Sequence, residues 1–96
     1  MILNERDTEE GLLVSVCDPD VLGETFEDGP VSLTVDEDFY DGETVDEDAV
    51  VRSLARCAVA NLVGTQTVEV AIEHGFVDEA NVLDIEDTRH AQMLRM

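Results

Sequence analysis

Residues 44–76, TVDEDAVVRSLARCAVANLVGTQTVEVAIEHGF, are the longest stretch with helical periodicity, and they decide the fold. Apolar side chains recur there at spacings of three and four residues, which places them on one side of a helix. The first apolar stripe consists of Val50, Leu54, Cys57, Ala58 and Leu62. A shorter stripe follows at Val68, Ala71 and Ile72. The pattern predicts two main helices, over about 46–63 and 66–74.

Both predicted helices have residues typical of helix ends. Thr44 is followed three positions later by Glu47, which is the spacing of a capping box. Gly64 and Gly75 follow the two stripes, at places where glycine commonly ends a helix. Two helices joined at a single glycine cannot bury both stripes against each other, so the flanking segments must supply a sheet.

Five flanking segments have strand-like patterns: 1–3, 12–17, 31–35, 82–85 and 90–94. In the second of them, alternation places Leu13, Ser15 and Cys17 on one side. Residues 4–11 are polar and are predicted to form a turn. We therefore expect one α+β domain over residues 1–96, with a mostly antiparallel sheet and both helices packed on one face.

Negative charge dominates the composition. The chain has 24 Asp and Glu residues against five arginines and no lysine, a net charge of −19. Concentrated salt would screen the resulting repulsion, and this acidic, lysine-free usage resembles proteins of halophilic archaea. Five scattered arginines form no basic stripe for nucleic acid, although molar salt would weaken that argument by screening phosphate attraction for every protein.

The sequence predicts a cytoplasmic protein without a membrane segment. No apolar run reaches the ~18 residues of a membrane span. Residues 1–6 lack the basic and apolar regions of a signal peptide. Cys17 and Cys57 both occupy apolar positions, so we expect buried free thiols in a reducing compartment.

The residues that most often carry chemistry do not form a known motif. Two cysteines and two histidines lack the spacing of zinc ligands, and the acidic clusters lack the glycine-centred pattern of a calcium loop. The chain also lacks a Gly-x-Ser-x-Gly nucleophile motif and a glycine-rich phosphate loop. We therefore expect no cofactor and no metal site, and the sequence argues against an enzyme.

Five polar or thiol residues nevertheless form a candidate binding set. Asn61 falls within the first stripe, where a buried amide needs partners; it either ties down the backbone before Gly64 or faces a ligand. His90 and Gln92 point to one side of their predicted strand, towards water or towards a site. The set consists of Cys17, Asp18, Asn61, His90 and Gln92.

Several short motifs occur in a recognisable order. They are Cys17-Asp18, Leu22-Gly23-x-Thr25-Phe26, Phe39-Tyr40-x-Gly42, Ala60-Asn61-Leu62-Val63-Gly64 and His90-Ala91-Gln92. Together they resemble the small archaeal family known as domain of unknown function 424, over nearly the whole chain. The resemblance implies an archaeal cytosolic protein with an α+β fold and no established activity. Arg89 differs from the proline that precedes His-Ala-Gln in that family, and residues 7–10 are an acidic insert.

Three hypotheses about function follow. The first is a non-enzymatic binding or accessory module with a protein or RNA partner, linked to RNA or translation machinery. The second is an enzyme or small-ligand protein with a site around the five candidate residues. The third is a structural dimerisation unit, forming a homodimer through an exposed apolar patch. Convergence of the candidate side chains on one concave pocket would favour the second hypothesis.

Overall fold

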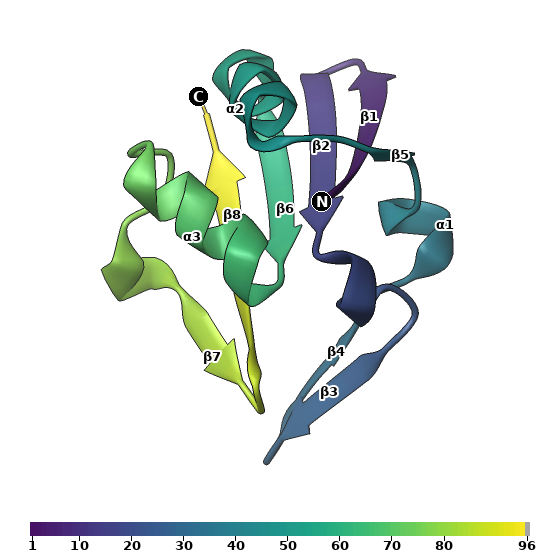
Figure 1. Ribbon diagram of the computed structural model, residues 1–96, viewed down its shortest axis with the longest axis vertical. Coiled ribbons are helices and arrows are strands. Elements are labelled where there is room, and N and C mark those ends of the chain that lie inside the picture. Colours follow the sequence, from purple (N-terminus) through teal and green to yellow (C-terminus); the bar gives the residue numbers. More distant parts are fainter. Residues whose placement is uncertain (96) are drawn as a thin grey trace.

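A mixed sheet of six strands, in the order β5-β1-β2-β6-β8-β7, forms the centre of the computed structural model, which describes residues 1–95 (Figure 1). Its strands are β1 (Ile2–Thr8), β2 (Gly11–Cys17), β5 (Glu43–Thr44), β6 (Val59–Val63), β7 (Leu83–Ile85) and β8 (Thr88–Leu94). A separate hairpin consists of β3 (Thr25–Asp28) and β4 (Val31–Thr34). The helices are α1 (Glu37–Tyr40), α2 (Glu47–Arg56) and α3 (Thr65–Glu73), with 3-10 turns η1 (Pro19–Val21) and η2 (Glu79–Asn81).

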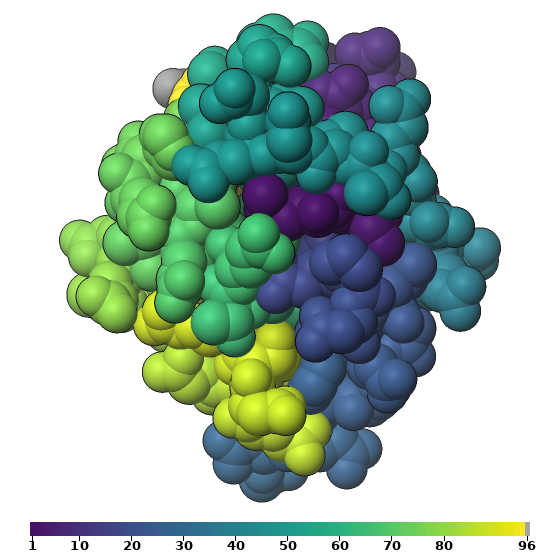
Figure 2. Space-filling view, viewed as in Figure 1, coloured from purple at the N-terminus to yellow at the C-terminus, as the bar shows by residue number. Residues whose placement is uncertain are grey.

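The predicted α+β class is confirmed. The pairs β1–β2, β1–β5, β6–β8 and β7–β8 are antiparallel, and β2–β6 is parallel. Helices α2 and α3 lie on the same side of the sheet (Figure 1). The teal and green atoms of these helices cover the upper and left parts of that side in the space-filling view (Figure 2).

The predicted helix over 46–63 is wrong beyond Arg56. Helix α2 ends at Arg56, Cys57 is extended with φ −75° and ψ 153°, and Val59–Val63 is the strand β6. The chain leaves the helix where the Ala58 N–H donates to the Leu12 carbonyl, 2.8 Å away. Strand β6 then pairs with β2 on one side and with β8 on the other. Pairing on both edges outweighs the local helical pattern, which a short apolar run shares with a buried strand.

Two smaller predictions also change. Residues 4–8 continue the strand β1, and the turn is limited to Glu9 and Glu10. The N-cap of α2 is Asp46, whose carboxylate accepts a hydrogen bond from the Ala49 N–H at 3.0 Å. Thr44, which the sequence suggested as the cap, belongs to β5. The second predicted helix, 66–74, is confirmed within one residue as α3.

The sheet has apolar clusters on both faces. Alternate residues of β2, β6 and β8 pack against α2 and α3: Val14, Val16, Ala60, Leu62, Ala91 and Met93. On the opposite face, Cys17 and Val63 are covered at one end of the sheet by a second cluster that includes Val21, Val35 and Tyr40. The predicted division of β2, with Leu12, Val14 and Val16 on one side and Cys17 on the other, is confirmed. On β6 and β8, the residues Val59, Asn61, Gln92 and Leu94 of this second face are not members of that cluster, and they lead to the candidate site.

Candidate functional site

The uncovered part of the second sheet face, here called the open face, consists of Leu13, Val59, Asn61, Gln92 and Leu94. Register places Leu13, Val59 and Leu94 side by side in one row across β2, β6 and β8. Leu13 and Val59 are half-buried, and Leu94 is 74% exposed. An apolar row that extends across three paired strands and remains in contact with water is typical of a contact surface.

Asn61 and Gln92 form the polar half of the open face. They are directly opposed on β6 and β8, and the Gln92 Nε2 donates to the Asn61 Oδ1 at 2.8 Å. The prediction that Asn61 lies in the apolar stripe of a helix is therefore wrong, because β6 turns its side chain away from α2 and α3. The Asn61 Nδ2 and the Gln92 Oε1 remain available, so this amide pair can donate and accept at once.

Among residues 1–95, the strands of the six-stranded sheet contribute no carboxylate to this side of the sheet. The acidic residues within its strands, Glu5, Asp7, Glu43 and Asp84, all alternate to the side that faces α2 and α3. Glu5 confirms the direction, because its Oε2 accepts from Ser53 Oγ and Arg56 NH2 of α2. In a chain with 24 acidic residues among 96, this separation is the strongest chemical signal in the structure.

The five candidate residues do not converge on one pocket. In the row beyond Asn61 and Gln92 on the same face, Cys17 and His90 lie on either side of Val63. Cys17 is fully buried beneath the second cluster. The His90 Nδ1 lies 2.9 Å from the Leu62 carbonyl, which can only accept, so Nδ1 carries a proton and Nε2 is left free. Asn61 and Gln92 are paired on the open face.

Asp18 has a separate role at the start of α3. Its carboxylate accepts from the Gln66 N–H at 3.0 Å, the Thr67 N–H at 2.9 Å and the Thr67 hydroxyl at 2.7 Å. Gly64, the residue at the N-cap position, has no side chain to do this, so a residue from a distant part of the chain caps the helix. Negative charge at that end also suits the helix dipole. With three bonds to protein, Asp18 is 8% exposed.

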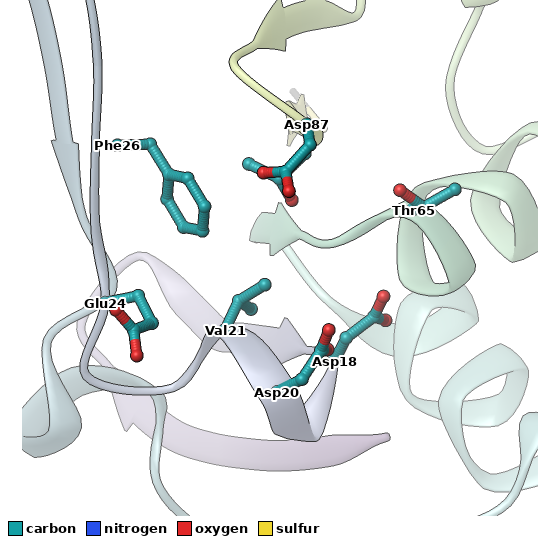
Figure 3. Close-up of a pocket in the computed structure, with 8 residues that line it drawn as sticks. Asp18, Asp20, Val21, Glu24, Phe26, Thr65 and Asp87 are labelled. Atoms are coloured by element: carbon teal, nitrogen blue, oxygen red, sulfur yellow. The ribbon is translucent and has the colours of Figure 1, made fainter.

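A hollow of about 240 Å³ lies beside this cap (Figure 3). The carboxylates of Asp18, Asp20 and Asp87 surround it, and the Phe26 ring of β3 points towards its centre. Within the described residues, no group of three or more His, Cys, Asp or Glu side chains is arranged to hold a metal ion. The lining also includes the side chains of Thr65 and Thr88.

The two thiols are unpaired and unsuited to nucleophilic chemistry. Burial, with the neighbouring Asp18 carboxylate, raises the pKa of Cys17 to about 11. Burial also raises the pKa of Cys57. A thiol reacts as its thiolate, and burial disfavours that form at both residues.

We expect Cys17→Ser to destabilise the fold more than Cys57→Ser. Cys57 donates its thiol hydrogen to the Leu54 carbonyl, 3.3 Å away, and a serine hydroxyl can keep that bond. Cys17 lies among Ile2, Val35 and Tyr40, where a hydroxyl would lose water without such a partner. Urea unfolding should show a loss of about 2–3 kcal/mol for Cys17→Ser and about 1 kcal/mol for Cys57→Ser. A larger loss for Cys57→Ser would contradict this assignment.

A family model described as "Protein of unknown function (DUF424)" matches residues 5–96. The chain belongs to this family. A solved structure described as an uncharacterized conserved protein from Methanopyrus kandleri is similar to this DUF424 chain, with a TM-score of 0.80 and 23% identity. The match covers 99% of this chain and 92% of the other, and at that identity it shows a shared fold. A search among curated proteins finds no match.

These comparisons leave the finer predictions untested. Halophilic and archaeal origin remain predictions for this DUF424 protein, as does a binding role for the five candidate residues. Over residues 1–95, the helices are too short or too polar to cross a bilayer.

Sequence reasoning missed Leu13, Val59 and Leu94 as parts of one surface. The alternation in 12–17 identified the outward direction of Leu13. Because residues 57–63 were interpreted as part of a helix, no second strand was predicted beside β2. Leu13, Val59 and Leu94 could therefore not be recognised as neighbours in one row. The visible signal was the alternation of Val59, Asn61 and Val63 within a run rich in valine.

Proposed function

We propose that this DUF424 chain is a non-enzymatic binding module and that the open face is its binding surface. The observation that carries the proposal is a sheet face without carboxylates in a chain with net charge −19. The centres of protein interfaces are depleted in Asp and Glu and enriched in apolar groups, as this face is. The Asn61–Gln92 pair supplies directional hydrogen bonds beside the apolar row.

A protein partner suits the open face better than RNA does. Arg6 is the arginine in the sheet row of Leu13, but its guanidinium already donates to Asn4 Oδ1 and to the Asp38 carbonyl. Its cation also lies 5.2 Å from the Phe39 ring centroid. The row thus offers a single cation, which already donates to two neutral oxygens, and none of its members Arg6, Leu13, Val59 and Leu94 has an aromatic side chain for stacking on a base. A cytoplasmic accessory role, including one in translation, would therefore act through a protein contact.

The test adds one carboxylate to the open face. Gln92→Glu keeps the shape of the side chain and changes its charge, and Gln66→Glu makes the same change at an exposed position on α3. Partners should be recovered by affinity purification in molar KCl, identified by mass spectrometry, and titrated as purified proteins. We expect Gln92→Glu to weaken binding at least tenfold, about 1.4 kcal/mol, and Gln66→Glu to bind like the unmodified chain. Equal binding by both variants would refute the open face as the surface.

A further inference from the structure

We propose that the occupant of the open face is a second copy of this chain, so that two sheets pack face to face in a symmetric dimer. This inference rests on the proposed function and names the partner for the same surface. Two-fold pairing brings each surface patch against its own equivalent, so the patch must be compatible with itself. The open face meets that requirement in charge and in hydrogen bonding, and it also presents an apolar row.

The charge of the open face distinguishes between the classes of partner that could bind it. A basic partner would be attracted to carboxylates, which occur elsewhere on the chain but not on this part of the sheet. Nucleic acid would require a group of cations, and the row of Leu13 contains one, Arg6, which donates to the Asn4 amide oxygen and the Asp38 carbonyl. A neutral surface fits best, because it meets the open face without burying an unpaired charge. A second copy provides such a surface and keeps every strand carboxylate on its far side.

Hydrogen bonding is also self-compatible. Asn61 and Gln92 use one donor and one acceptor on each other, with 2.8 Å between Nε2 and Oδ1. Each amide retains both a donor and an acceptor, so two copies of the pair can bond across a two-fold axis. Half of this bonding capacity would be lost against a partner that offered donors alone or acceptors alone.

The apolar row completes the match. Leu13, Val59 and Leu94 project from three adjacent strands, and the side chains of two facing sheets interdigitate at a spacing of roughly 10 Å. Leu94 is 74% exposed in the single chain and would gain most from being covered. Both copies carry net charge −19, so their association should strengthen as salt screens the repulsion.

Sedimentation equilibrium across protein concentration tests the dimer at ~0.1 M and ~2 M KCl, which span the screening range. The unmodified chain should reach twice its monomer mass, with a dissociation constant at least tenfold lower in the higher salt. Leu94→Arg places a charge in the row, and Val31→Arg makes a similar change at a 40% exposed valine on the separate β4 hairpin. Leu94→Arg should remain monomeric and folded by circular dichroism, whereas Val31→Arg should dimerise normally.

The outcomes distinguish this inference from the proposed function. A chain that stays monomeric in both salts, or a dimer that Leu94→Arg leaves intact, overturns the second copy as the occupant. If a monomeric chain still loses an identified partner on Gln92→Glu, the open face remains a binding surface for a different protein. Association that weakens with added salt would also overturn the inference, because it would indicate a contact driven by opposite charges.

Discussion

Gly64→Ala should lower the free energy of unfolding by about 3–5 kcal/mol, a large part of the roughly 5–15 kcal/mol typical of a domain. Gly64 has φ 118° and ψ 148°, a backbone conformation that residues with a Cβ rarely adopt. An added Cβ would lie 2.3 Å from the Asp18 Cγ and 2.6 Å from its Oδ2. The alanine therefore strains its own backbone and displaces the carboxylate that caps α3. Urea unfolding monitored by circular dichroism measures the loss.

Gly75→Ala is the matched control, because it separates backbone strain from the collision. Gly75 also has a positive φ, 76°, but an added Cβ there would meet no atom within 4 Å. Its replacement should cost about 1 kcal/mol. The cost of Gly64→Ala should fall in an Asp18→Ala background, where the colliding carboxylate is gone. Equal costs for the two glycine variants would show that the contact with Asp18 is unimportant.

Asp18→Ala should be the second most damaging of these changes, with a loss of about 3–4 kcal/mol. Two backbone N–H groups and the Thr67 hydroxyl would lose their acceptor together. Thr67 is completely buried, so water cannot easily replace the carboxylate there. Chemical unfolding in molar KCl gives the free energy. Asp18→Asn should retain part of the capping through its single amide oxygen and lose less.

Asp46→Ala provides the comparison for an ordinary cap. Asp46 is exposed and accepts one bond, from the Ala49 N–H at the start of α2. Its removal should cost about 1 kcal/mol. If Asp18→Ala lowered the free energy of unfolding no more than Asp46→Ala does, the three hydrogen bonds of Asp18 would contribute little to stability. A role for Asp18 in the adjacent acidic hollow would then be the better explanation of its position.

The sequence predicted fold class better than it predicted element boundaries. Helix α3 was found because an apolar stripe and two flanking glycines agree with the structure there. The end of α2 was missed because neither glycine nor proline marks Cys57 or Ala58. The pairing of Val59–Val63 with β2 and β8 ends that helix, and the short apolar run by itself is compatible with either a helix or a strand.

The candidate site shows the same limit. Sequence reasoning selected Asn61 and Gln92, which the structure brings together, because amides at apolar or alternating positions are conspicuous. It could not find that Asp18 caps α3, because the whole connection between β2 and β6, and then β6 itself, lies between the two in the sequence. It also could not see the absence of carboxylates from one face, since that depends on the register of all six strands.

The parallel pairing of β2 with β6 has a consequence for how the chain assembles during its synthesis. The β1–β2 hairpin is complete once Cys17 has emerged, but its second neighbour is separated from it by residues 18–58. At a typical synthesis rate of about 5–20 residues per second, the ribosome needs roughly 2–8 s to deliver that connection. Helix α2 is synthesised near the end of that interval and α3 after it, so for most of the interval Val14 and Val16 have no helix above them. The nascent chain therefore passes through a stage in which its most apolar strand is finished but uncovered.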